Sequence, residues 1–272
     1  MTAVVPVAES VTWLFVPGSR RDRFDRAAGS GADEVILDLE DAVSPDDKDD
    51  AREDVASWLD GPGSGWVRIN GTGTEWHEED LAALRGRRGL RGVVLPKAEE
   101  PDSLAAAHDV LPPGAGLVAL VESALGVSRA TELARSGVVG RLAFGSIDFA
   151  LDIGAEESDE ALLLARSSLV LASRLGDLPP PLDGVTVSTT DGEAVHDAAV
   201  RARSLGFGGK LCIHPNQVET VAAGFRPTAA QLDWASRVVE AGEGVHVVDG
   251  QMVDRPVLAH AQSILVRAGV RR

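Results

Sequence analysis

The stretch LVALVES, residues 117–123, is a short apolar run that ends at a carboxylate and a serine. Its apolar residues are continuous rather than alternating, which is typical of a strand buried on both faces of a parallel sheet. Seven other runs of this kind occur along the chain, at 12–16, 34–39, 65–69, 92–95, 141–144, 184–187 and 209–213. We therefore expect eight strands of a parallel sheet.

Helical stretches separate these runs. The clearest spans residues 46–59, where Ser44-Pro45 supplies an N-cap and a first-turn proline, and Gly61-Pro62 ends the helix. Similar stretches lie at 99–110, 124–135, 159–175 and 192–205. Regular alternation of eight strands with helices favours an α/β fold, a (β/α)8 TIM barrel. An open, doubly wound sheet is the alternative.

The composition limits the class of protein. The 272 residues carry a formal net charge of −16, which disfavours a protein that binds nucleic-acid backbones. Cys212 is the single cysteine, so an intramolecular disulfide is excluded. The first ten residues, MTAVVPVAES, lack the basic and apolar regions of a secretory signal, and no run is long enough for a membrane span. We expect a cytoplasmic protein with no nucleic-acid and no membrane partner.

The pattern changes after residue 213. Residues 217–224 and 228–241 have helical patterns, and residues 246–253 contain Asp249-Gly250, a hairpin-turn signal. A last helix is expected from about 256 to 268. We predict a barrel domain over residues 1–225 and a C-terminal arm over residues 226–272.

Ionisable side chains gather where the predicted strands end. Active sites of α/β barrels lie at the carboxyl ends of the strands, so these side chains are candidates for the functional site. They are Arg20, Asp38, Glu40, Asp41, Arg68, Lys97, Glu122, Asp148 and His214.

Glu122 and Asp148 follow adjacent predicted strands. Each could be an acid that caps a helix, since both lie near a helix start. A carboxylate buried at a strand end is costly, however, unless it is paired or binds a metal. Two such oxygen donors without a neighbouring cysteine or histidine suit Mg²⁺, with Mn²⁺ as a possible substitute. We predict that these two carboxylates hold a divalent metal.

Arg68 has two interpretations. It could form a salt bridge with Asp38 or Glu40, because buried charges must pair. It could also bind a substrate carboxylate or an enolate oxygen. We predict that Arg68, Glu122, Arg20 and Lys97 contact the substrate. Asp38, Glu40 and Asp41 are expected to hold Arg68, Lys97 and metal-bound waters.

The order of these short motifs resembles that of the HpcH/HpaI aldolase and citrate lyase beta-subunit-like family. The resemblance covers almost the whole chain. The motifs are FVPGSR at 15–20, DLEDAV at 38–43 with Lys48 and Ala51-Arg52, RIN at 68–70, LPK at 95–97, VESA at 121–124, GSIDFA at 145–150, GFGGKLCIHPNQ at 206–217 and GQMVDRP at 250–256.

The resemblance implies a (β/α)8 barrel that cleaves or forms a carbon–carbon bond next to a carboxylate, with Glu122 and Asp148 as metal ligands and Arg68 binding substrate. It also implies that Asp254, on the arm, is an acid/base residue that several relatives deliver into a neighbouring subunit's site. The alternative for Asp254 is an N-cap of the last helix. By the same analogy we expect a homo-oligomer, a trimer or a hexamer.

Members of this family act on citryl, malyl, citramalyl or 3-hydroxy-3-methylglutaryl thioesters, usually of coenzyme A. The resemblance therefore implies a Mg²⁺-dependent lyase that converts a 3-hydroxyacyl thioester into a 2-oxo acid, or a related keto acid, and an acyl-CoA. Three alternatives stay open: a malyl-CoA-type thioesterase, a metal-dependent 2-oxo acid aldolase without coenzyme A, and a partner-dependent citrate lyase beta subunit.

Overall fold

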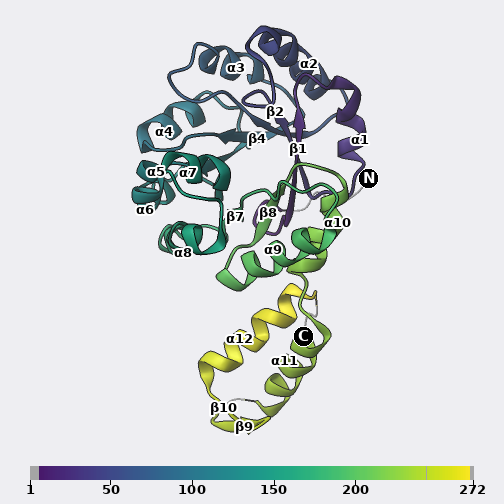
Figure 1. Cartoon of the computed structure of the whole chain (residues 1–272), viewed down its shortest axis with the longest axis vertical. Coiled ribbons are helices and arrows are strands. Elements are labelled where there is room, and N and C mark those ends of the chain that lie inside the picture. Colours follow the sequence, from purple (N-terminus) through teal and green to yellow (C-terminus); the bar gives the residue numbers. More distant parts are fainter. Residues whose placement is uncertain (1–5, 243, 270–272) are drawn as a thin grey trace. The chain divides into compact units, whose positions relative to one another are not determined.

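A computed structural model describes residues 6–242 and 244–269 (Figure 1). This description leaves out residues 1–5, 243 and 270–272. The last four of these residues belong to the predicted arm. The fold divides between Ala222 and Ala223 into two compact units. The predicted domain boundary, after residue 225, falls three residues further along. Among the described residues, none of the helices combines the length and the apolar character needed to cross a bilayer.

The first unit is a closed barrel of eight parallel strands. Strand β1 pairs with β2 on one side and with β8 on the other, with Thr12 opposite Lys210. This closure confirms the predicted TIM barrel and excludes the open sheet. The strands are β1 (Thr12–Pro17), β2 (Glu34–Asp38), β3 (Gly65–Arg68), β4 (Leu90–Leu95), β5 (Gly116–Val121), β6 (Arg141–Phe144), β7 (Leu182–Asp183) and β8 (Gly209–Cys212).

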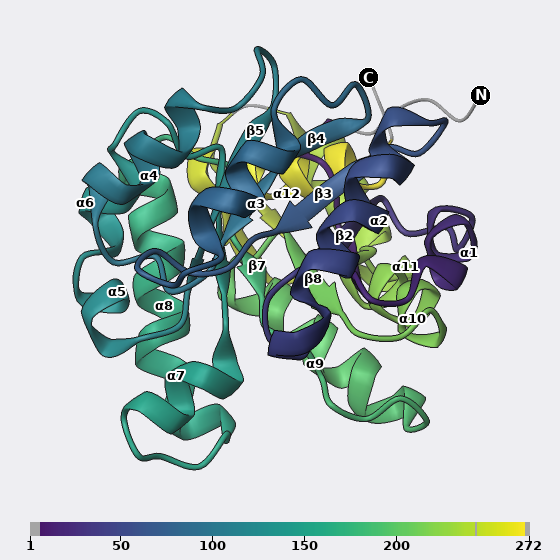
Figure 2. The same cartoon turned by 90° about the horizontal axis from the view of Figure 1, so that it is seen from above.

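Helices lie outside the ring of strands, as Figure 2 shows for α4, α6 and α8. The predicted helices at 159–175 and 192–205 are confirmed without a change of bounds. The helices of the first unit are α1 (Phe24–Ala28), α2 (Lys48–Asp60), α3 (His77–Leu84), α4 (Pro101–Asp109), α5 (Ala124–Ser128), α6 (Ala130–Ala134), α7 (Ser146–Asp152), α8 (Asp159–Leu175) and α9 (Gly192–Leu205), with 3-10 turns η1 (Arg21–Arg23) and η2 (Pro45–Asp47). The division between the units falls within α10 (Asn216–Phe225).

Two helix predictions need correction. The helix predicted from 124 to 135 is interrupted at Arg129, so that it forms α5 and α6. The Ser128 hydroxyl donates to the carbonyl of Leu125, a local bond that competes with helix continuation. The helix predicted from residue 46 begins instead as the 3-10 turn η2 at Pro45. Its Ser44 hydroxyl bonds to the Asp47 carboxylate rather than to a backbone N–H group.

The strand predicted at 184–187 is wrong. Strand β7 comprises only Leu182 and Asp183, and the chain leaves the sheet at Gly184. The carbonyl groups beyond it accept hydrogen bonds from side chains rather than from neighbouring strands: Gly184 from Lys210, and Thr186 and Ser188 from Gln217. Because these side chains come from β8 and α10, no local pattern in the sequence could show that the strand ends early.

Side chains from alternate strand positions fill the barrel. Trp13 and Trp66 are both members of this core, with ring centroids 4.9 Å apart. The Trp66 ring lies against Gly92 and Gly116, where a Cβ atom at Gly92 would fall 2.3 Å from the ring and 2.3 Å from the Gly116 carbonyl oxygen. Glycine is therefore required at position 92 by the close approach of the indole ring and the adjacent strand.

We expect the substitution Gly92→Ala to lower the free energy of unfolding by about 1–3 kcal/mol, because the added methyl group overpacks the barrel core. Urea unfolding followed by tryptophan fluorescence measures this change. Gly140→Ala is the matched control, since the nearest atom to its Cβ would be 3.5 Å away and Gly140 is exposed. Equal stability of the two variants would contradict the packing argument.

The second unit is a helical hairpin with a small antiparallel sheet, made of α11 (Ala229–Ala241), β9 (His246–Val248), β10 (Gln251–Val253) and α12 (Arg255–Arg267). Asp249 and Gly250 both have positive φ and form the predicted hairpin turn. Its own core contains Ala235, Val238, Val253, Ala261, Ile264 and Leu265. The unit thus buries an apolar face of its own.

Candidate active site

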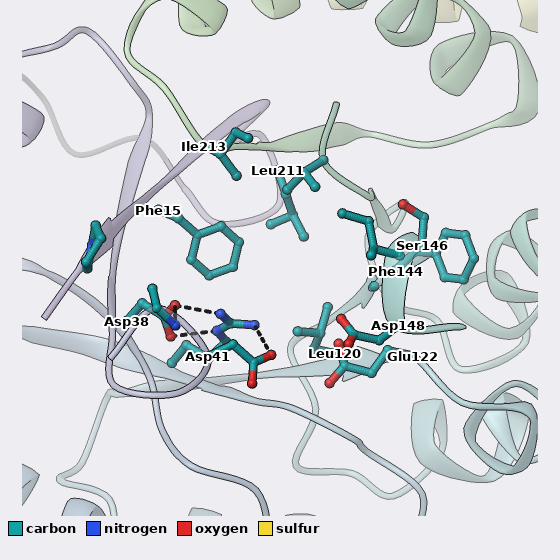
Figure 3. A pocket seen from close by; sticks show the side chains of 16 residues that line it. Phe15, Asp38, Asp41, Leu120, Glu122, Phe144, Ser146, Asp148, Leu211 and Ile213 are labelled. Atoms are coloured by element: carbon teal, nitrogen blue, oxygen red, sulfur yellow. Dashed lines mark hydrogen bonds and ion pairs between the residues drawn. The ribbon is translucent and has the colours of Figure 1, made fainter. Parts of the chain in front are cut away.

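A cavity of about 430 Å³ lies at the carboxyl ends of the barrel strands. Figure 3 shows Asp38 and Asp41 on one side of it, Glu122 and Asp148 on the other, and Leu120 between them. The lining residues are Phe15, Pro17, Asp38, Asp41, Ala42, Arg68, Leu120, Glu122, Phe144, Gly145, Ser146, Ile147, Asp148, Val185, Leu211 and Ile213. Parallel strands that close into a barrel bring these residues together, although they are spread over about 200 positions of sequence.

Glu122 and Asp148 point into the same part of the cavity. Glu122 follows β5, and Asp148 lies in the first turn of α7, directly after β6, the strand that pairs with β5. The Glu122 side chain is buried, and its Oε1 accepts a 2.8 Å hydrogen bond from the Lys97 N–H group. A Cβ atom at Gly145 would lie 2.3 Å from the Glu122 Oε2 atom, so glycine leaves the space that this carboxylate occupies.

The electrostatic environment of Glu122 suits a cation. Burial, and then the charges of Glu40 and Asp148, raise the pKa of the Glu122 carboxyl to about 8. In the described parts of the chain, no group of three or more His, Cys, Asp or Glu side chains is placed to hold an ion. A pair of carboxylates instead leaves coordination positions for water and substrate, as Mg²⁺ prefers. The donor set therefore fits a magnesium ion.

Arg68 also lines the cavity, and acidic side chains hold its guanidinium. Its Nε and Nη2 atoms donate to the two Asp38 oxygens at 2.7 and 2.5 Å, and its Nη1 lies 2.9 Å from Glu40 Oε2. Burial alone would lower the pKa of Arg68, but Asp38 and Glu40 outweigh it and the pKa is raised. The guanidinium also lies over the Phe15 ring, 4.8 Å from its centroid. The salt bridge considered from the sequence is thus present, and the same group borders the cavity.

Lys97 and Asp41 lie next to the group formed by Arg68, Asp38 and Glu40. Lys97 Nζ lies 2.5 Å from Glu40 Oε1, so Glu40 is shared between Lys97 and Arg68. Asp41 Oδ2 is 3.9 Å from Arg68 Nη1. Lys97 has a positive φ of 49°, and its backbone N–H group donates a hydrogen bond to Glu122. Lys97 therefore joins the acids on one side of the cavity to Glu122 on the other.

Arg20 does not line the cavity. Its guanidinium binds the Asp22 carboxylate at 2.8 and 2.9 Å on the exposed surface that follows β1. Its contact with substrate stays a prediction. His214 also lies outside the cavity lining, and its Nδ1 accepts a hydrogen bond from the Asn216 N–H group, a local contact at a helix start.

Asp254 belongs to the second unit, where it is the N-cap of α12. Its Oδ1 accepts a 3.2 Å hydrogen bond from the Val257 N–H group. The capping alternative is therefore realised, and the catalytic role implied by the resemblance stays a prediction.

Lys48 supports the site, a role that the sequence argument missed. Its buried Nζ donates to the carbonyls of Leu39 and Glu40 at 2.6 and 2.7 Å and to Asn70 Oδ1 at 2.7 Å. These bonds hold the loop that carries Glu40. A signal was present, because Lys48 falls on the same face of α2 as the buried residues Ala51 and Val55.

Ser146 was missed as well. It is buried, lines the cavity two residues before Asp148, and donates a 2.8 Å hydrogen bond to Glu157.

Comparisons with known proteins agree with this architecture. The family model described as HpcH/HpaI aldolase/citrate lyase matches residues 12–215. A citrate lyase subunit beta-like protein of Mycobacterium tuberculosis is 38% identical over 268 residues, which cover 94% of this chain and 95% of that protein. A (3S)-malyl-CoA thioesterase of Cereibacter sphaeroides is 32% identical, with 94% and 93% covered.

A solved structure extends the comparison. The protein CitE from Mycobacterium tuberculosis, in complex with magnesium, acetoacetate and coenzyme A, superposes with a TM-score of 0.87 at 34% identity, over 97% of this chain and 100% of that one. The fold, the family match and these near full-length relatives agree. The chain belongs to the HpcH/HpaI aldolase/citrate lyase family of enzymes.

Proposed function

We propose that this enzyme is a Mg²⁺-dependent carbon–carbon lyase that cleaves a 3-hydroxyacyl thioester, a coenzyme A ester, into a 2-oxo acid or related keto acid and an acyl-CoA. The observation that carries the proposal is the pair of carboxylates, Glu122 and Asp148, which line one cavity together with Arg68. The magnesium, acetoacetate and coenzyme A bound by the related CitE protein support it.

Glu122 and Asp148 are the residues that would hold the metal. Bound there, Mg²⁺ would supply Lewis acidity toward the hydroxyl and carboxylate oxygens of the substrate. Mn²⁺ also accepts oxygen ligands and is a possible substitute. Asp38 and Glu40 are bound to Arg68 and Lys97, and Asp41 lies 3.9 Å from Arg68 Nη1. Glu122 and Asp148 point into the same part of the cavity, and they are the pair proposed to hold a cation.

The reaction breaks the bond between the carbon that bears the hydroxyl group and the α-carbon of the thioester. The hydroxyl loses its proton and becomes the carbonyl oxygen of the keto acid, while the electron pair of the broken bond passes to the thioester enolate. A proton added at the α-carbon completes the acyl thioester. In this scheme Arg68 stabilises negative charge on the substrate, and Asp254 carries the proton.

A thioesterase is the second candidate, favoured by the similarity to the (3S)-malyl-CoA thioesterase. In that reaction water attacks the thioester carbonyl and the carbon–carbon bond stays intact. The two reactions differ in their products, since a lyase releases a keto acid and an acyl-CoA, whereas a thioesterase releases a hydroxy acid and free coenzyme A.

A panel assay tests the proposal. Purified protein is incubated with malyl-, citramalyl-, citryl- and 3-hydroxy-3-methylglutaryl-CoA, with Mg²⁺ and after removal of metal by a chelator. We expect Mg²⁺-dependent formation of acyl-CoA and keto acid from at least one ester. Formation of free coenzyme A and hydroxy acid alone would favour the thioesterase. Inactivity on every ester would favour the partner-dependent subunit or the aldolase that acts without coenzyme A.

The quaternary structure is also a proposal. We infer a homo-oligomer, a trimer or a hexamer, from family analogy. Light scattering coupled to size-exclusion chromatography measures the mass directly, and a monomeric mass at working concentrations would contradict this inference.

A further inference from the structure

Helix α8 presents apolar side chains to the solvent. The helix lies outside the ring of strands (Figure 2), and its amphipathic pattern buries one of its sides. On the other side Leu164, Leu171 and Leu175 are 78%, 65% and 52% exposed. Because helical residues four or seven positions apart share a face, the three leucines form one stripe along the helix. Aligned leucines with this degree of exposure are typical of a surface that contacts another protein.

The residues at the middle of this stripe are small and uncharged. Ser167 and Ser168 lie between Leu164 and Leu171, and both are half-buried. Arg166, the charged residue beside the serines, is buried on the inner side of the helix, where it is bound to an acid of β7. A second helix can therefore approach closely at the serines without burying a charge of this face.

The two ends of the stripe carry opposite charges. Glu160 lies in the first turn of α8 and Arg174 in its last turn, and both residues are exposed. These two charges cancel, whereas the whole chain carries a formal net charge of −16, which would make two copies repel each other. The outer face of α8 is thus a surface on which two copies can meet without a local excess of negative charge.

The side chains of this face are arranged symmetrically about the middle of the helix. Leu164 and Leu171 lie at equal distances on either side of the two serines, and Glu160 and Arg174 lie further out on either side. If two copies of α8 cross in opposite directions at the serines, Leu164 of each copy meets Leu171 of the other. Glu160 of each copy then lies near Arg174 of the other. A two-fold contact requires such a surface, one that is complementary to itself.

We infer that α8 is a contact surface for a second copy of this chain, whose own α8 packs antiparallel against it across a two-fold axis. The inference goes beyond the proposed catalytic function and does not depend on it. A closed trimer has no two-fold axis, so this contact distinguishes between the two proposed assemblies. In the hexamer, three pairs of α8 helices would join two trimers.

The mass of the assembly tests the contact. We expect the wild-type protein to have the mass of an even-membered oligomer by light scattering coupled to size-exclusion chromatography. Leu171→Glu should weaken the contact at least about 100-fold and give particles of half the mass, because it places an unpaired carboxylate in the interface. Val187→Glu is the matched control and should keep the wild-type mass, since Val187 is similarly exposed, at 63%, and lies outside α8. Circular dichroism checks that both variants fold.

Reversing the charges tests the antiparallel direction. Glu160→Arg and Arg174→Glu should each weaken association about 10-fold, because each variant places like charges opposite one another at both ends of the helix pair. The double variant exchanges the two charges and should restore wild-type association. A double variant as weak as the single ones would contradict the antiparallel pairing.

A disulfide crosslink tests the position of the axis. Ser168→Cys places two cysteines next to the proposed two-fold axis, whereas Glu160→Cys places them about 20 Å apart along the helix direction. Cys212, the single cysteine of the chain, is buried and does not compete. Mild oxidation should therefore crosslink Ser168→Cys into covalent dimers and leave Glu160→Cys as single chains on a non-reducing gel.

Several results would overturn the inference. They are a monomeric or trimeric mass for the wild type, an unchanged mass for Leu171→Glu, no crosslink at position 168, and equal crosslinking at positions 160 and 168. None of these results bears on the lyase reaction, which the panel assay tests separately.

Discussion

Replacing Asp148 by asparagine should lower Mg²⁺-dependent turnover by about 10³-fold or more, because the metal would lose one of its two anionic ligands. Asparagine keeps the shape of the side chain but not its charge. Asp148 is half-buried at the start of α7, so the change should leave the fold intact. Initial rates over a range of Mg²⁺ concentrations measure the effect, on whichever thioester the panel assay selects.

A second measurement separates metal binding from folding. Mg²⁺ at about 100 times its dissociation constant should stabilise the wild type by about 2.7 kcal/mol, and it should stabilise Asp148→Asn far less. Without metal the variant should be no less stable than the wild type, because one of the like charges near Glu122 is gone. Asp152→Asn, the same change one turn further along α7, should keep full activity. Full activity in Asp148→Asn would contradict the assignment of Asp148 as a metal ligand.

Replacing Asp254 by asparagine should lower kcat by about 10²–10⁴-fold, if this residue carries the proton as proposed. Asparagine caps helices about as well as aspartate, so the bond to the Val257 N–H group should survive and the stability should change little. Asp254→Ala should lose activity and in addition cost about 0.5–2 kcal/mol of stability. The difference between the two variants separates catalysis from capping.

A matched control exists in the first unit. Asp191 caps α9 through a 3.0 Å bond from the Ala194 N–H group, so Asp191→Asn makes the same change at a second N-cap. It should retain wild-type kcat. Retention of wild-type kcat by Asp254→Asn would instead reduce Asp254 to a structural cap. Mixing the inactive Asp148→Asn and Asp254→Asn proteins tests the family analogy further, since partial recovery of activity requires that one subunit's arm serves another's barrel.

Local patterns in the sequence were sufficient to predict most of the fold. Seven of the eight predicted strands overlap observed ones, and α8 and α9 have the predicted bounds. The exception, β7, is informative. Residues 184–187 look like a strand, yet side chains of Lys210 and Gln217 take the carbonyl groups that a sheet would use. Those partners are 26 to 31 residues away, beyond the reach of any periodicity.

The candidate site was likewise predictable from the sequence only in part. Charged residues at strand ends could be recognised in the sequence because a parallel barrel brings every carboxyl end to one edge, so their convergence follows from topology alone. The pairing of these charged residues with one another does not follow from topology. That Arg68 binds Asp38 and Glu40, and that buried Lys48 holds the Glu40 loop, depends on distances across strands that only barrel closure sets.

The apolar part of the cavity lining was the feature of the site that the sequence alone could least predict. Phe15, Leu120, Val185 and Leu211 look in sequence like ordinary core residues; Leu120 and Leu211 do belong to the barrel core, and Phe15 and Val185 pack against it. Local periodicity specifies which face of a strand is buried, but not whether the buried side chain meets another residue or an open cavity. Closure of the barrel decided that, because it brings four distant segments around one space that their side chains leave unfilled.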